Sequence, residues 1–307
     1  MLLRVGIAAN TRQMGRDKLD EVVRNREEHG ASTMRYGRTH LRRIAVCCMA
    51  SLFAGFAGRA SAGAEPAASN VLAIGIQEFT LGANEWSRSH MTNAVAIFDT
   101  AGRVDSDSFL CHYWKGAAQF HVLLHRLGVE SDKQDADAIL RNMADAIQSL
   151  EHAVQLKADH GESHALLSTI HGLRIARRPM TALGRGPKVL RHKRKALAVD
   201  APGPRVYYLL GMSSLHAPGF LGGRDEAMEF LLKAEKLFEA ERKKGVQPLL
   251  PSWGYDHCLA FLGEAYCQSG HEEKGRAYYQ KALAVNPKHK KARDGLAACT
   301  KTGAAGP

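Results

Sequence analysis

The chain has 307 residues, of which 45% are hydrophobic and 7% aromatic, values that are ordinary for a soluble globular protein and name no function. Its formal charge of +11 is unevenly spread, because residues 1–62 hold 11 Lys and Arg and 5 Asp and Glu, which leaves a surplus of +5 beyond them. A surplus that small, scattered over helical faces, argues against a nucleic-acid partner, which needs a clustered basic patch.

Residues 34–64 have the three parts of a secretory signal. A basic segment is followed by an apolar stretch from Ile44 to Gly58, and then by small residues that end at Ala62 and Ala64. Because a membrane span needs about 20 apolar residues, this shorter stretch favours export and cleavage near Ala62 over a permanent anchor. We therefore expect an exported protein, periplasmic or secreted, of the bacterial envelope.

Details of this region leave alternatives open. Met34 is a natural translation start, so residues 1–33 need not be translated. Arg42-Arg43 could belong to a twin-arginine signal, although the flanking residues match that signal poorly. Cys47 and Cys48 lie within the apolar stretch and away from the cleavage point, which argues against lipid attachment. We divide the chain into an extension and signal (1–62), a linker (63–70), a helical domain (71–300) and a flexible tail (301–307).

Four cysteines remain beyond the signal, Cys111, Cys258, Cys267 and Cys299, in a compartment that permits disulfides. Cys258 and Cys267 cannot pair if they share a helix, because nine residues of helix separate them by about 13 Å. A bond between Cys267 and Cys299 stays open, and the alternative is that these are small apolar core residues.

A period of about 34 residues runs through the rest of the chain. Its clearest unit is LAFLGEAYCQSGHEEKGRAYYQKALAVNP, from Leu259 to Pro287. This unit resembles the tetratricopeptide repeat, W-x2-L-G-x2-Y, A-x3-F, P, with Leu259 in place of Trp and Gly275 in place of the first Ala. The marks that we assign to packing within and between units are Leu81, Gly82, Ala94, Phe98 and Ala101; Gly116, Ala146, Leu150 and Ala153; Leu167 and Ala196; Leu210, Gly211, Ala227, Leu231 and Ala234; and Leu262, Gly263, Tyr266, Tyr279, Ala282 and Pro287.

The resemblance covers about residues 71–300 and implies an all-α fold. We expect a right-handed superhelix of about five helix-turn-helix repeats, closed by a polar helix after Pro287. Irregular spacing places insertions at residues 127–137, 178–187, 216–223 and 243–254, and the second is expected to be a Pro/Gly loop. Lys193 stands where a bulky apolar residue is expected. GPRVYYLLG, HAPGFLGG and PSWG are similar to secreted bacterial tetratricopeptide proteins of unassigned function.

Proteins of this kind hold partners in a concave groove lined by the first helix of each repeat. The residues that we predict to face the groove are Phe79, Trp86, Tyr113, Trp114, Phe120, His121, Arg205, Tyr208, Met212, Phe261 and Gln268. Phe220 lies in a loop that could either close over the groove or fill a gap between the fourth and fifth units. This wall is aromatic and has Arg205 as its basic residue, which favours an apolar or amphipathic segment over a C-terminal carboxylate. The alternative is that Tyr113, Trp114 and Phe261 pack between helices. If they line the groove, Trp114→Ala and Tyr208→Ala should leave the fold intact and abolish binding.

Histidines are the main candidates for other chemistry. His121 and His125 lie four residues apart, and His160, His164 and His171 share a helical face, spacings that could bind a divalent metal. No convergent third ligand accompanies either set, so we predict no metal and no cofactor. Cys111 and His112 are neighbours on a helix and do not face each other.

The sequence has no motif of a hydrolase, metalloprotease or phosphate-binding loop and predicts a protein that is not an enzyme. We expect a protein-binding scaffold of the cell envelope that holds a polypeptide in its groove. The alternative is a structural component that docks on an envelope complex, and a metal-binding or enzymatic role comes third. The identity of the partner, the biological process and the oligomeric state do not follow from the sequence.

Overall fold

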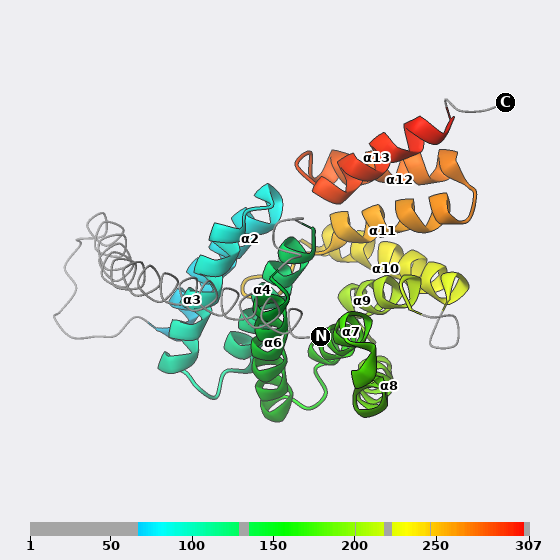
Figure 1. The fold of residues 1–307 in the computed structure, drawn as a ribbon. Coiled ribbons are helices and arrows are strands. Elements are labelled where there is room, and N and C mark those ends of the chain that lie inside the picture. The colour runs from blue at the N-terminus through cyan, green and yellow to red at the C-terminus, as the bar shows by residue number, and fades with distance from the viewer. Residues whose placement is uncertain (1–66, 129–134, 200, 218–222, 246, 304–307) are drawn as a thin grey trace, which may run out of the picture. The chain divides into compact units, whose positions relative to one another are not determined.

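The computed structural model describes residues 67–128, 135–199, 201–217, 223–245 and 247–303, which belong to one compact unit, Pro66–Pro307 (Figure 1). The predicted signal with its cleavage site, and Phe220 in the expected loop, lie outside these residues.

The described residues form helices without strands, as the all-α prediction requires. In chain order these are α2 (Ala68–Glu85), α3 (Arg88–Val104), α4 (Phe109–Gly128), α6 (Ala136–Leu156), α7 (Gly161–Arg177), the 3-10 turn η1 (Pro179–Thr181), α8 (Ala182–Ala198), α9 (Pro204–Leu215), α10 (Arg224–Lys244), α11 (Tyr255–Gln268), α12 (Glu272–Val285) and α13 (Lys290–Gly303).

Consecutive helices pack as pairs: α2 with α3, α4 with α6, α7 with α8, α9 with α10, and α11 with α12. The second helix of each pair also contacts the first helix of the next pair. Helix α13 packs on both α11 and α12, in the place that the first helix of a further pair would take, and so covers the end of the stack. This nearest-neighbour packing is the arrangement of a helical repeat protein.

The glycine marks of the sequence are points where two helices of a pair approach closely. A Cβ added at Gly116 would lie 2.6 Å from Leu150 Cγ, and one at Gly263 would lie 2.7 Å from Tyr279 Cδ1. Such distances are too short for any side chain, so the glycine makes room for the bulky residue of the second helix. Gly211 has the same relation to Leu231.

In the first pair, α2 and α3, the glycine that faces the bulky residue of the second helix is not the one that the sequence pattern predicts. The glycine beneath Phe98 is Gly75, where an added Cβ would lie 2.5 Å from the ring, and not Gly82. Leu81 is 48% exposed. Gly82 lies about two helical turns further along and makes room for the backbone of Met91, because the turn between α2 and α3 is tight.

Alanines at the corresponding late position of the second helices are each fully buried: Ala101, Ala153, Ala196, Ala234 and Ala282. The other packing marks are also buried, except that Leu81 and Pro287 are exposed and Tyr266 is half-buried. Small side chains at these places let the next pair approach closely.

The loop predicted over 178–187 is wrong, because α8 begins at Ala182 and runs through Pro187. A proline in the second turn of a helix removes one backbone hydrogen bond, a cost that packing of the rest of α8 against α7 offsets. Lys193 occupies its bulky position by placing its ammonium 2.6 Å from Glu226 of the following pair and 5.4 Å from the centre of the Phe230 ring.

The ends of the helical domain differ slightly from the predicted limits, since α2 begins at Ala68 and α13 extends to Gly303. Among the helices described, none combines the length and apolarity needed to cross a bilayer.

Candidate functional site

The first helices of the pairs form one continuous wall, because α2, α4, α7, α9 and α11 contact one another in succession. The predicted groove residues come from these helices, but most of their side chains are buried: Phe79, Tyr113, Trp114, Phe120, His121, Arg205, Tyr208, Met212 and Phe261. Trp86 is half-buried and Gln268 is exposed. The structure therefore supports the core alternative for most of the predicted groove residues.

Trp114 illustrates this burial. It is 1% exposed, and its ring centre lies 5.4 Å from that of Phe79 and 5.8 Å from that of Phe98. Tyr208 is fully buried. We therefore now expect Trp114→Ala and Tyr208→Ala to destabilise the fold, because each would leave a cavity in the core.

The chain itself covers part of the wall. Residues 247–254, here called the crossing segment, connect α10 to α11 and lie against α4 and α9. Trp114 Nε1 donates to the carbonyl of Leu249 at 2.9 Å, and Trp253 Nε1 donates to the hydroxyl of Tyr113 at 3.2 Å. Leu249 has φ +65°, a left-handed conformation that a branched side chain rarely adopts. The hydrogen bond from Trp114 to its carbonyl favours this conformation.

Arg205 is the main anchor of the crossing segment. Arg205 is 2% exposed, and its guanidinium donates to the carbonyls of Pro251 at 2.5 Å and of Trp253 at 3.1 Å. It also pairs with Glu162 at 3.0 Å and, through both terminal nitrogens, with Glu241 at 2.9 and 2.7 Å. Each nitrogen of the buried guanidinium thus donates to at least one oxygen atom, as burial requires.

The carboxylates fix the electrostatics of this site. Burial acts to lower the pKa of Arg205, but Glu162, Tyr113 and Glu241 outweigh it and raise the pKa above its ordinary value. Burial raises the pKa of Glu241 despite Arg205. Tyr113 donates to Glu162 at 2.7 Å, and burial together with Glu162 raises its pKa well above the ordinary value. With two carboxylates around one guanidinium, the site does not attract a further carboxylate.

Trp253 is the side chain by which the crossing segment enters the wall. Its ring is 8% exposed, and its centre lies 4.9 Å from the ring of His121 and 6.3 Å from that of Tyr208, both edge-to-face. Arg205 lies 6.0 Å from the Trp253 ring centre. Predicted groove residues therefore do enclose an aromatic side chain, but one from the same chain.

A pocket of about 910 Å³ lies beside the crossing segment. Its lining combines the C-terminal end of α2, the N-terminal ends of α9 and α11, and one face of α10. Lys233 and Lys244 contribute exposed ammonium groups that the sequence prediction missed. A volume in this range is typical of ligand sites.

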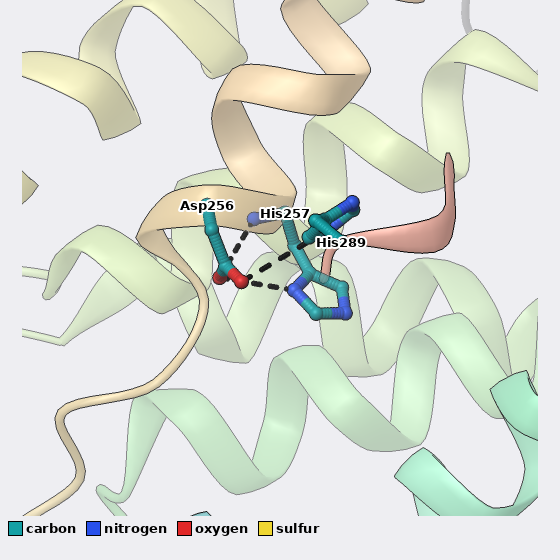
Figure 2. Close-up of side chains that lie close together, drawn as sticks. All are labelled: Asp256, His257 and His289. Atoms are coloured by element: carbon teal, nitrogen blue, oxygen red, sulfur yellow. Dashed lines mark hydrogen bonds and ion pairs between the residues drawn. The ribbon is translucent and has the colours of Figure 1, made fainter. Parts of the chain in front are cut away.

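Asp256, His257 and His289 form a cluster between the N-terminus of α11 and the start of α13 (Figure 2). One donor atom from each residue lies within 4.8 Å of the others, and among the described residues this is the group that could hold a metal ion. Asp256 accepts from the backbone and Nδ1 of His257 at 2.9 and 3.1 Å and from Asn286 at 2.9 Å. Sequence spacing missed this cluster, because His289 meets the other two residues only through the packing of α13 on α11.

Hydrogen bonds in the cluster assign its protons. His289 Nδ1 accepts the backbone N–H of Ala292 at 3.2 Å, so in the neutral ring the proton lies on Nε2, 4.0 Å from Asp256. When a histidine binds a metal through one ring nitrogen, its second ring nitrogen usually carries the proton and donates a hydrogen bond. In His289 the second nitrogen, Nδ1, accepts instead. The geometry therefore fits a hydrogen-bonded helix connection better than a preformed metal site.

The histidine sets that the sequence singled out do not converge. His121 Nδ1 donates to the carbonyl of Ala117, whereas the ring of His125 stacks on Trp86. His164 contacts His192 at 3.0 Å between their Nδ1 atoms, and His171 accepts from Arg185. His160 instead accepts hydrogen bonds from Ser163 at the N-terminus of α7.

Cys267 and Cys299 are thiols in the structure. Burial, with a hydrogen bond to Cys299, raises the pKa of Cys267 to about 12. The two sulfur atoms are therefore neighbours, although α11 and α13 carry them.

Residues 257–289 match the sequence model of the tetratricopeptide repeat. A thermophilic tetratricopeptide-repeat (TPR) protein of Thermus thermophilus has a solved structure that matches this one with a TM-score of 0.54 and 19% identity, over 76% of this chain and 99% of that chain. This chain has a TPR-like fold.

The HusA haemophore from Porphyromonas gingivalis shares the TPR-like fold, with a TM-score of 0.53 and 20% identity over 67% of this chain and 96% of that one. At such identities the likeness concerns the fold alone. No curated protein matches the sequence significantly. TPR folds are typical of protein–protein interaction scaffolds, which use the concave surface of the stack.

Proposed function

We propose that this chain is a non-catalytic scaffold of the bacterial envelope, which holds an extended segment of a partner protein against its first-helix wall. The observation that carries the proposal is the crossing segment. Trp114 and Arg205 donate to the main-chain carbonyls of Leu249, Pro251 and Trp253, contacts that any extended polypeptide can make. The wall is therefore chemically suited to bind a peptide.

The pocket beside the crossing segment supplies the open surface for a partner. Exposed Thr80, Asn84, Lys233 and Lys244 line it together with buried aromatic residues. A partner with apolar side chains and some acidic ones fits this lining, because the apolar groups can enter the pocket while carboxylates face the lysines. No reaction is assigned to the site.

The envelope location rests on the signal pattern of residues 34–64. If the protein is exported and processed, its mature N-terminus lies after Ala62 or Ala64, which N-terminal sequencing of the exported protein measures. A mature protein that keeps Ile44–Gly58 and stays with the membrane would contradict the location.

The proposal that the partner binds in this pocket is tested by crosslinking and pull-down from the envelope. The recovery of the partner is compared for two charge variants of α10. Lys244→Glu changes the pocket lining, whereas Lys236→Glu changes an exposed residue of the same helix that does not line it. We expect Lys244→Glu to reduce recovery of the partner and Lys236→Glu to leave it unchanged. Equal recovery with both variants would contradict the groove proposal.

The second candidate, a component that docks on an envelope complex, has support from another surface. Met180 and Leu183 are 96% and 92% exposed at the η1–α8 junction, an unusual exposure for large apolar side chains. If docking occurs here, Met180→Ser with Leu183→Ser abolishes association with a membrane assembly, while Lys244→Glu has no effect.

A further inference from the structure

The crossing segment is a polypeptide already seated on the proposed binding surface. Its exposed residues are Gln247, Pro248, Leu250 and Ser252, so the segment lies at the surface and is held at a few points. Those points are the carbonyls of Leu249, Pro251 and Trp253 and the ring of Trp253.

Two glycines allow the chain to enter and leave this path. Gly245 has φ +83° and Gly254 has φ +103°, conformations that glycine adopts without strain. At Gly254 an added Cβ would lie 3.2 Å from Phe238, so a larger residue would press on the core. The segment thus joins α10 to α11 through flexible residue types at both ends while its middle contacts α4, which lies more than a hundred residues earlier in the chain.

We propose that the crossing segment is an internal ligand of the wall, and that the partner binds by taking its place with an extended, proline-containing segment that carries a tryptophan. This inference rests on the proposed function and specifies the partner's chemistry. The partner's carbonyls accept the hydrogen bonds of Trp114 and Arg205, and its tryptophan enters the site between His121 and Tyr208.

Three features favour a replaceable ligand over a permanent part of the core. The donors on the wall are directed at main-chain oxygens, so they do not distinguish this segment from another extended peptide. The left-handed Leu249 is a conformation that costs about 1–3 kcal/mol and that a free peptide need not share. The buried contacts are concentrated in one aromatic anchor, Trp253, as in peptide-binding sites.

The test uses the synthetic peptide QPLLPSWG, which has the sequence of residues 247–254, and measures its binding to the full chain by fluorescence anisotropy. In one variant, residues 247–253 are replaced by Gly and Ser at the same length. An internal competitor reduces the apparent affinity by the fraction of time that the site is open, so removing it should tighten peptide binding by about tenfold or more. Ser252→Ala, an exposed position of the same segment, should bind like the wild type.

Two further changes test which groups bind the peptide. The peptide with Ala in place of its tryptophan should not bind the replaced variant. Adding Trp114→Phe to the replaced variant keeps an aromatic ring but removes the indole N–H, and should weaken binding of the intact peptide. A folded replaced variant that binds neither peptide overturns the inference. That result leaves the proposed scaffold standing, because scaffold function is judged by partner recovery with Lys244→Glu.

If the replaced variant does not fold, hydrogen exchange of the wild-type protein tests whether the crossing segment leaves the wall. The backbone amides of Leu249, Leu250 and residues 252–254 should exchange much faster than those of α4 and α9, which would show that the segment leaves the wall without unfolding the stack, as the inference requires. Exchange of the segment only with global unfolding overturns it, and so does a dimer formed by mutual exchange of crossing segments.

Discussion

Arg205 shows how one residue can join three parts of this protein. It lies near the start of α9, pairs with Glu162 of α7 and Glu241 of α10, and donates to two carbonyls of the crossing segment. Because this cation is buried away from water, its contribution to stability depends on all of these partners being present.

Replacing Arg205 with Gln should therefore destabilise the fold by about 3–5 kcal/mol, because the Glu162 side chain, only 13% exposed, would lose its counter-charge. Urea denaturation measures the loss. The matched control is Arg103→Gln, which removes an exposed ion pair with Asp99 one turn away and should change stability by no more than about 0.5 kcal/mol. Similar losses for the two variants would show that the Arg205 network contributes little.

His289 determines what the cluster with Asp256 and His257 can bind. Because its Nδ1 accepts a backbone N–H at the start of α13, metal binding through Nε2 would cost this helix-capping bond. We expect dialysis against zinc, followed by elemental analysis, to give well below one ion per chain. The control is His271→Ala, which removes an exposed histidine. About one zinc ion per chain in the wild type and in His271→Ala, but none in His289→Ala, would contradict the prediction that the cluster binds no metal.

At the scale of the helix pair, the contact between a glycine and a bulky residue sets how closely two helices approach. Gly116→Ala would place a Cβ 2.6 Å from Leu150 Cγ, and overpacking of this kind costs about 1–3 kcal/mol. Gly172→Ala is the control, because a Cβ there meets nothing within 4 Å and lies within α7. It should stabilise the protein by about 0.5–1 kcal/mol through helix propensity. Thermal or urea unfolding of both variants tests the pair, and changes of equal sign would contradict it.

The contact between α11 and α13 provides a second test at this scale. If the protein is exported, we expect oxidised glutathione to join Cys267 and Cys299, the two thiols passing their electrons to the oxidant. A disulfide that closes the loop between Cys267 and Cys299 should stabilise the fold by about 2–4 kcal/mol. Mass spectrometry after digestion, with and without reductant, detects it. Cys299→Ser should remove the effect and Cys111→Ser should keep it, and a crosslink that survives in Cys299→Ser would contradict this pairing.

For the molecule as a whole, buried neutral histidines link stability to pH. Burial, followed by His164 and nearby Arg191, lowers the pKa of His192 to about 3. Burial and Arg185 lower that of His171 to about 4. An unfolded histidine has a pKa of about 6.5. Between about pH 3 and pH 6.5 the unfolded state therefore binds more protons than the folded state does. The stability that these two histidines contribute is therefore fully present above about pH 6.5 and decreases as the pH falls.

The loss at pH 5 should be about 2 kcal/mol for His192 alone, measured by urea denaturation at pH 7.5 and 5. His192→Gln should lose less on acidification than the wild type does. His271→Gln changes an exposed histidine and should behave like the wild type. A pH response that is identical in His192→Gln and the wild type would contradict the assignment.

Much of this fold could be predicted because its packing is local. Gly116 and Leu150, or Gly263 and Tyr279, face each other within one helix pair, so the same small and bulky residues recur along the chain at a regular interval. Even so, the contact of Phe98 with Gly75 shows that a register can shift by two helical turns within an otherwise correct assignment.

The sequence by itself determined the all-α class, the paired helices and the closing helix, because each follows from contacts between neighbours in the chain. Only the tertiary structure decided that Trp114 and Tyr208 are core residues, and that Trp253 of the crossing segment lies against Tyr113 and Tyr208. These contacts join residues far apart in the chain, up to 140 positions in the bond between Trp253 and Tyr113. A contact made once, between distant residues, leaves no periodic pattern, whereas a contact repeated in every unit does.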